Sequence, residues 1–155
     1  MNPQDPGFGK EQLNIDRAAI FGVYCASCHG AAGDGSGLPG QARNMTVLKG
    51  WKRSAKVTDI YRTLSEGIEG TQMRAFPNLT PWERVAVAHY VRSFSKEPLP
   101  QDTPEDYEAL VRDYGLDKVQ APEETIPIER AMELLVMEAG GRGAAEDGPS
   151  SGGKP

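Results

Sequence analysis

Residues 24–37 read Tyr-Cys-Ala-Ser-Cys-His-Gly-Ala-Ala-Gly-Asp-Gly-Ser-Gly, and this stretch contains both cysteines of the 155-residue chain. Cys25 and Cys28 are three positions apart, and His29 follows the second cysteine directly. On a helix, residues at positions i, i+3 and i+4 point to nearly the same side. The spacing therefore predicts that two thiols and one imidazole reach a common ligand.

Four kinds of site can be considered for this motif. A structural zinc site needs four ligands, but the chain has two cysteines and two histidines, and the second histidine, His89, lies within an expected helix. A thioredoxin-like dithiol would follow a strand, and no strand pattern precedes the motif. A disulfide or a pair of buried thiols requires neither His29 nor the glycine-rich residues after it. Covalent haem attachment through Cys-x-x-Cys-His accounts for all three side chains.

Haem attachment gives each residue of the motif a role. Thioether bonds from Cys25 and Cys28 would hold the porphyrin, and the imidazole of His29 would bind the iron. The other ring nitrogen of such a histidine donates to a backbone carbonyl, which orients the ring and raises its basicity. We expect this carbonyl in the loop that contains Pro39, and we count Pro39 among the cofactor-binding residues.

Apolar spacing and capping residues predict the helices around the motif. A first helix is expected over residues 13–28 and a short one over residues 57–66. The segment Thr80-Pro-Trp-Glu83 combines an N-cap, a proline at the first helical position and a capping-box glutamate, so a helix is expected from there to about Ser95. Residues 29–50 contain six glycines and predict a loop.

The chain changes character after that helix. Residues 97–104 contain three prolines and predict a linker. Two further helices are expected, one opened by Thr103 and ended by Gly115, and one over residues 127–139 with an apolar stripe formed by Ile128, Met132, Leu135 and Ala139. The predicted organisation is a flexible N-terminal segment (1–12), a haem domain (13–97), an acidic extension (98–139) and a disordered tail (140–155).

Charge and hydropathy exclude several classes of function. Residues 1–95 carry 11 Lys and Arg against 8 Asp and Glu, whereas residues 96–155 carry 6 against 14. This acidic second part disfavours nucleic acid as a partner. The mean hydropathy is -0.51, and no apolar run approaches the roughly 18–20 residues that span a bilayer. The first residues lack the pattern of a secretory signal, so we expect any export signal or anchor to be absent from this chain.

The segment CASCHGAAGDGSGLPG at residues 25–40 resembles the haem-binding segment of bacterial class I c-type cytochromes, in which a Gly-Asp-Gly-x-Gly loop follows the motif. The resemblance covers about residues 12–95. It implies an all-α fold, the small class I cytochrome c fold, with N- and C-terminal helices crossing around one covalently bound haem c. This chain adds a C-terminal helical extension. Phe21 and Tyr90 resemble the aromatic contacts at that crossing.

The resemblance also implies a methionine as second axial ligand, just before the last helix of the domain. Met73 lies in the loop before that helix, and we expect it to bind the iron opposite His29. Met45 follows His29 too closely and is expected to pack against the haem edge or its own loop. The other candidates lie in expected helices, where packing is their ordinary role: His89, Met132 and Met137. In the family a proline closely follows the ligand, whereas three residues separate Met73 from Pro77.

An iron bound on both sides by His29 and Met73 has no open position for a substrate, so this ligation predicts one-electron transfer rather than catalysis. Such a haem suits a respiratory chain, between a quinol-oxidising complex and a terminal oxidase. The alternative is a small-gas sensor or ligand-binding cytochrome with a labile sixth ligand. A two-haem peroxidase is disfavoured because the second attachment motif is missing.

Partners and location are inferred from the same resemblance. The expected partners are redox proteins of a respiratory chain. The layout resembles a monohaem subunit or domain of a bacterial membrane respiratory complex, such as alternative complex III, whose other subunits residues 100–139 would contact. In bacteria this family receives its haem outside the cytoplasm, so we expect the periplasm or the outward-facing side of the cytoplasmic membrane. Basic residues gather near Trp51, either as a solvated face or as contacts to an acidic partner or the haem propionates: Arg43, Lys49, Lys52, Arg53 and Lys56.

Overall fold

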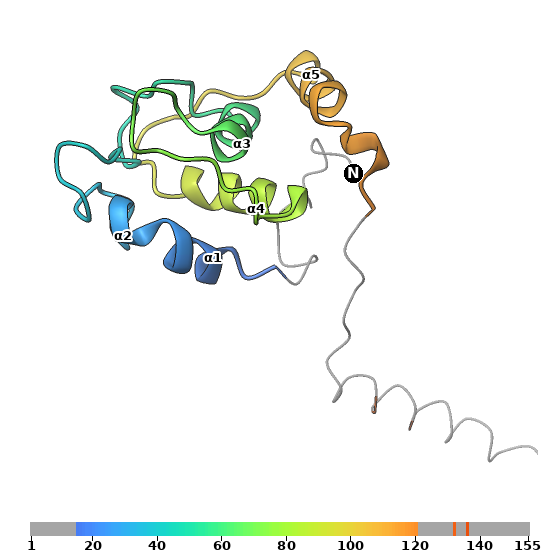
Figure 1. The fold of residues 1–155 in the computed structure, drawn as a ribbon, viewed down its shortest axis with the longest axis horizontal. Helices are drawn as coiled ribbons and strands as arrows, with labels where there is room; N and C mark the ends of the chain where they lie inside the picture. The colour runs from blue at the N-terminus through green and yellow to red at the C-terminus, as the bar shows by residue number, and fades with distance from the viewer. Residues whose placement is uncertain (1–14, 121–131, 133–135, 137–155) are drawn as a thin grey trace, which may run out of the picture. The chain divides into compact units, whose positions relative to one another are not determined.

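The computed structural model describes residues 15–120 together with Met132 and Val136 (Figure 1). Regular structure in this part of the chain is entirely helical, which confirms the expected all-α fold. The helices are α1 (Arg17–Tyr24), α2 (Ala26–His29), α3 (Val57–Glu66), α4 (Pro81–Arg92) and α5 (Pro104–Tyr114), followed by the short 3-10 helix η2 (Leu116–Lys118). Among the described residues, none of these helices is long and apolar enough to cross a membrane.

The first helix differs from its prediction, because residues 17–29 form two helices rather than one. The carboxylate of Asp16 accepts a hydrogen bond from the backbone N–H of Ala19 at 2.9 Å, so α1 begins after Asp16. The backbone of Cys25 (φ -122°, ψ -38°) leaves the regular helical conformation and separates α1 from α2. The carbonyl of Cys25 still accepts from the N–H of His29 at 2.9 Å. One tight turn therefore carries both cysteines and the histidine.

The capping signals placed the starts of α4 and α5 correctly. In α4 the Thr80 hydroxyl accepts from the N–H of Glu83, and the Glu83 carboxylate accepts from the N–H of Thr80 at 2.7 Å. Thr103 and Asp106 form the same reciprocal pair at the start of α5. Gly115 ends α5 in the left-handed conformation, as expected. The helix α3 has the predicted limits, whereas α4 ends at Arg92, a little before the expected Ser95.

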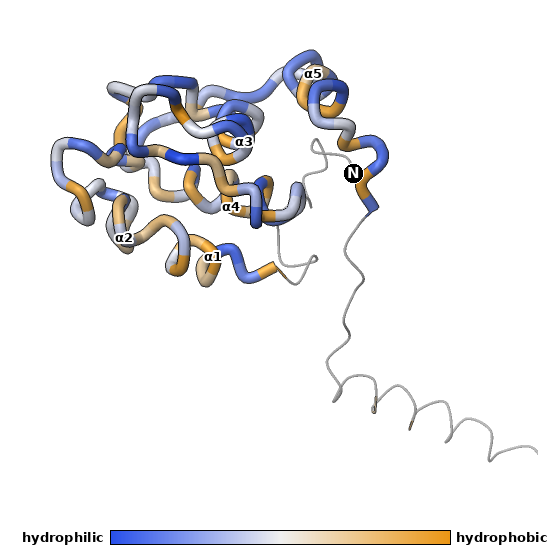
Figure 2. Tube along the Cα trace, in the orientation of Figure 1, coloured by the Kyte–Doolittle hydropathy of each residue, from blue (hydrophilic) through white to orange (hydrophobic). Residues whose placement is uncertain are grey.

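The core lies around α4, which packs against both α1 and α3 (Figure 1). Val85, Val87 and Ala88 of α4 are completely buried. The ring of Phe21 meets that of Tyr90 edge to face at a centroid distance of 5.4 Å, so the expected aromatic contact between these helices is confirmed. Figure 2 shows apolar residues along both α1 and α4. Burial of this shared surface fixes the direction in which α2 leaves α1.

The first part of the acidic extension packs on α3. Leu110 of α5 is completely buried, and Leu116 is 1% exposed. The carboxylate of Asp102 accepts hydrogen bonds from the backbone N–H groups of Val57 and Thr58 at 2.8 and 2.9 Å, so it caps the N-terminus of α3. Residues 102–120 are thus part of the same compact unit as the helices before them.

Two salt bridges add to this contact. Lys56 pairs with Asp106 at 2.7 Å, and Arg62 pairs with Asp113 at 2.9 Å. The second helix expected in the extension, over residues 127–139, lies outside the described residues except for Met132 and Val136, which are both helical. The boundaries of the four predicted segments stay predictions.

Candidate functional site

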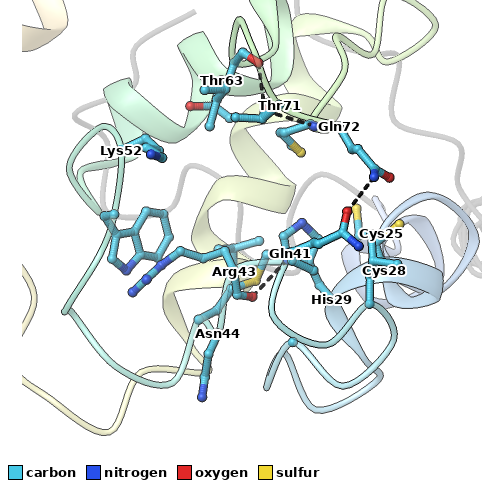
Figure 3. A pocket seen from close by; sticks show the side chains of 18 of the residues that line it. Cys25, Cys28, His29, Gln41, Arg43, Asn44, Lys52, Thr63, Thr71 and Gln72 are labelled. Atoms are coloured by element: carbon cyan, nitrogen blue, oxygen red, sulfur yellow. Dashed lines mark hydrogen bonds between the residues drawn. The ribbon is translucent and has the colours of Figure 1, made fainter.

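A cavity of about 1020 Å³ opens between the Cys-x-x-Cys-His turn, α3, α4 and three loops (Figure 3). This volume lies at the upper end of the roughly 300–1,000 Å³ of typical ligand sites. The loops are residues 34–45, residues 50–53 and residues 68–76. Every site residue predicted from the sequence lines this cavity: Cys25, Cys28, His29, Pro39 and Met73. The fold therefore brings together residues that are up to 48 positions apart.

His29 is buried and held by one ring nitrogen. Its Nδ1 donates to the backbone carbonyl of Arg43 at 3.0 Å, which leaves Nε2 for a metal (Figure 3). We expected this carbonyl from the loop that contains Pro39; Arg43 belongs to that loop, and Pro39 itself is not the acceptor. The N–H of Ala42 bonds to the carbonyl of Leu38 at 2.9 Å. This turn carries the chain past Pro39 and brings the carbonyl of Arg43 to the imidazole ring of His29.

The two thiols differ in exposure. Cys25 is buried and Cys28 is exposed, while both line the cavity. Burial, and then the neighbouring Cys28, raise the pKa of Cys25 to about 11. A Cβ at Gly37 would lie 2.3 Å from the carbonyl oxygen of Ser27, between the two cysteines. The glycine-rich loop therefore packs directly on the backbone of the turn, which explains its glycine at this position.

The backbone of Met73 is fixed to the end of α3. The N–H of Ile68 donates to the carbonyl of Met73 at 2.8 Å. Gly67 has a φ of +73°, and a Cβ there would lie 2.8 Å from the same carbonyl oxygen. Met45 is buried and lines the same cavity. The structure thus places two methionines at the cavity together with His29, and the choice of Met73 as ligand stays a prediction.

Arg43 organises the loop beside the cavity. Its guanidinium donates to the carbonyls of Val47 and Lys49 and lies 4.8 Å from the centre of the Trp51 ring. The indole of Trp51 also donates to the carbonyl of Val47, at 3.1 Å. Burial lowers the pKa of Arg43. Sequence reasoning grouped Arg43 with other basic residues but missed this role, since it depends on the path of the loop.

Two arginines that line the cavity each have a buried guanidinium nitrogen without a partner among the described residues. Nε of Arg43 and Nη1 of Arg53 are buried and have no hydrogen-bond partner among the described residues. Both residues line the cavity. Cationic guanidinium groups beside the cavity favour anionic acceptors on a bound ligand. The carboxylates of a haem propionate pair supply such acceptors.

The basic cluster near Trp51 therefore divides into two parts. Arg43, Lys52 and Arg53 line the cavity, which favours the interpretation as contacts to haem propionates. Lys56 instead pairs with Asp106 of α5. Arg53 and Lys56 are close in sequence but contact different parts of the protein, because the chain turns between them before α3 begins.

A hydrogen bond between two glutamines joins two of the loops that line the cavity. Nε2 of Gln72, next to Met73, donates to Oε1 of Gln41 at 2.5 Å (Figure 3). Gln41 belongs to the loop that also contains Arg43, the partner of His29. The bond therefore connects the loop that orients His29 with the loop that carries Met73. Its two residues are 31 positions apart, and no local sequence signal indicates the pairing.

The residues at the cavity fit a haem attached through two thioethers. They provide two thiols on one turn, an imidazole whose Nδ1 is already occupied, and partnerless guanidinium donors. Apolar side chains form the walls: Ile60, Leu64, Phe76, Val87 and Val91. Such a wall would limit the access of water to the bound haem.

The comparison with family models agrees with this fit. The family model described as Cytochrome c matches residues 18–95. A chain of the Kuenenia stuttgartiensis reducing HAO-like protein complex is 32% identical, with a TM-score of 0.47, over 56% of this chain and 47% of that chain. The present chain thus corresponds to about half the length of that solved chain. No curated protein matches the sequence. The family match includes the motif, the cavity loops, α3 and α4, and it ends before α5.

Proposed function

Because the chain belongs to the cytochrome c family, we propose that it transfers single electrons with His29 and Met73 as the axial ligands of its haem. The haem c is bound covalently through Cys25 and Cys28. When bound, it supplies an iron that alternates between the ferrous and ferric states. The observation that carries the proposal is that one cavity joins both thiols, Nε2 of a fixed His29 and the anchored Met73.

The protein residues set the properties of this centre. The bond from Nδ1 of His29 to the Arg43 carbonyl fixes the ring and makes it a stronger ligand. A methionine ligand and burial both raise the reduction potential relative to a haem with two histidines. Cys28 is exposed, so the edge of the site near this residue is open to solvent. We infer that electrons enter and leave at this edge.

The axial ligands can be tested by optical spectroscopy of the holoprotein. The oxidised wild type is expected to show the weak far-red band of sulfur bound to iron, and the reduced protein to resist carbon monoxide at neutral pH. Met73→Ala should abolish the band and admit carbon monoxide. Met45→Ala, the matched control from the same cavity, should retain the band.

Two results would contradict this assignment. Loss of the band in Met45→Ala but not in Met73→Ala would exchange the roles of the two methionines. Rapid binding of carbon monoxide by the wild type would show an open iron. That result would support the alternative function, a small-gas sensor or ligand-binding cytochrome.

We further propose a place in a respiratory chain, between a quinol-oxidising complex and a terminal oxidase, in the periplasm or on the outward-facing side of the membrane. The support is the haem chemistry of the family and the ligation proposed above. The same reasoning proposes redox proteins of that chain as partners. Fractionation of cells that produce the native protein checks the location, and its recovery with the cytoplasmic fraction would refute it.

Contact with other subunits of a membrane complex is proposed for the later part of residues 100–139. Residues 102–120 pack on α3, whereas Met132 and Val136, one helical turn apart, are 60% and 70% exposed. A pull-down should compare the full chain with a chain that ends at Gln120 and so keeps α5. Equal retention of redox partners by both chains would remove this role.

A further inference from the structure

Arg53 connects the cavity to α5 through Glu66. Its Nη2 binds Oε2 of Glu66 at 2.9 Å, while Nη1 is buried without a partner among the described residues. The other carboxylate oxygen of Glu66, Oε1, accepts a hydrogen bond from the hydroxyl of Tyr114. A continuous series of contacts therefore runs from Tyr114 at the end of α5, through Glu66 at the end of α3, to a cavity-lining guanidinium.

Tyr114 is a firmly placed donor. Its ring meets that of Tyr61 edge to face at a centroid distance of 5.2 Å, and the guanidinium of Arg62 lies 5.6 Å from its centre. Burial, and then the bond to Glu66, raise the pKa of Tyr114 to about 12, so the hydroxyl keeps its proton near neutral pH. The same bond is the largest cause of the lowered pKa of Glu66, which stays ionised and able to hold Arg53.

The guanidinium of Arg53 needs the ion pair with Glu66 to keep its orientation. Its side chain is 33% exposed, so an unrestrained guanidinium would turn toward water. With Nη2 bound to Glu66, the planar group has a fixed orientation beside the cavity that Arg53 lines. The carboxylates of a bound haem would be anionic acceptors for this guanidinium.

We propose that α5, through Tyr114 and Glu66, positions Arg53 against a propionate of the bound haem, and that this sets the pH dependence of the reduction potential. The proposal rests on haem binding but not on Met73 as the sixth ligand. The helix α5 lies beyond the family match of residues 18–95. The positioning device is therefore contributed by the segment that this chain adds to its family domain.

The direction of the effect follows from electrostatics. A cation in contact with a carboxylate lowers the pKa of that carboxylate, by roughly 1–3 units for a close pair. A deprotonated propionate favours the ferric iron, so the potential falls as pH rises through the propionate pKa. Contact with Arg53 places this fall at low pH. Loss of the contact moves the fall to higher pH.

The test measures the midpoint potential of the full-length holoprotein against pH. Arg53→Gln should move the fall in potential to higher pH by about one unit. Glu66→Gln should move it in the same direction, because the guanidinium is released. If Glu66 acted only as a nearby charge, its removal would lower the propionate pKa and move the fall to lower pH. The sign of the shift therefore separates positioning from direct charge.

Further variants complete the test. Tyr114→Phe should give a smaller shift to higher pH, and adding Glu66→Gln to Arg53→Gln should give no further upward shift. Glu108→Gln is the matched control, since it removes an exposed carboxylate of the same helix as Tyr114 that has no hydrogen bond or ion pair with the described residues. It should leave the profile unchanged.

Three results would overturn the proposal: a downward shift in Glu66→Gln, no shift in that variant, or an equal shift in Glu108→Gln and Tyr114→Phe. The haem absorption of each variant reports attachment, and the far-red band reports the sulfur ligand. A failure of positioning is therefore distinguishable from a failure of the proposed axial ligation.

Discussion

Replacing Asp102 with alanine tests whether the segment after residue 97 is a structural part of the haem domain. The carboxylate of Asp102 accepts from the N–H of Val57 at 2.8 Å, and from the N–H and hydroxyl of Thr58 at 2.9 and 2.6 Å. Val57 and Thr58 are only 2% and 3% exposed. Loss of a cap costs about 0.5–2 kcal/mol, and a buried donor without a partner costs about 1–3 kcal/mol. Because water can reach part of this helix end, we expect a total loss of about 2–4 kcal/mol.

The free energy of unfolding can be measured by guanidinium denaturation of the holoprotein, followed by circular dichroism. In thermal unfolding of the same holoprotein, the Tm should fall by about 8–16 °C, at about 4 °C per kcal/mol for a domain of this size. Asp117→Ala is the control, since this exposed carboxylate has no hydrogen bond or ion pair with the described residues. A loss in Asp102→Ala no greater than in the control would refute the capping of α3 by the extension.

Three other substitutions give distinct expectations. Leu110→Ala removes a completely buried side chain and should cost about 2–5 kcal/mol in the same denaturation assay. Gly67→Ala forces a φ of +73° on a residue with a Cβ, at about 1–2 kcal/mol, and should weaken the far-red band by displacing Met73. Glu66 has a pKa below its ordinary 4.5, first because of the bond from Tyr114, so its contribution to stability is complete above about pH 4.5 and is lost as pH falls through the lowered folded-state value. The stability of Glu66→Gln should accordingly depend less on pH over that range. An acid-unfolding curve equal to that of the wild type would contradict the contribution of ionised Glu66 to stability.

The parts of the fold that the sequence predicted correctly depend on local signals. The capping boxes at Thr80 and Thr103 act within one helical turn, so their residues could be recognised without knowledge of the fold. The two cysteines and His29 reach one cavity because their spacing alone places them on one turn. These predictions required no information about distant segments.

The parts that sequence reasoning missed depend on long-range contacts or on exact loop paths. The capping of α3 by Asp102 joins residues 45 positions apart, and neither segment indicates its partner. The acceptor for His29 lies in the loop that contains Pro39, as expected, but the sequence did not indicate which carbonyl of that loop, that of Arg43, reaches the ring. The interruption at Cys25 was missed because the apolar spacing continues through it.

The most direct measurement of the central claim is the intact mass of the matured protein after treatment with acidified organic solvent. Covalent attachment through Cys25 and Cys28 predicts the mass of the polypeptide plus one haem, with the colour remaining on the protein. The mass of the bare polypeptide, with the colour extracted into the solvent, would contradict the account.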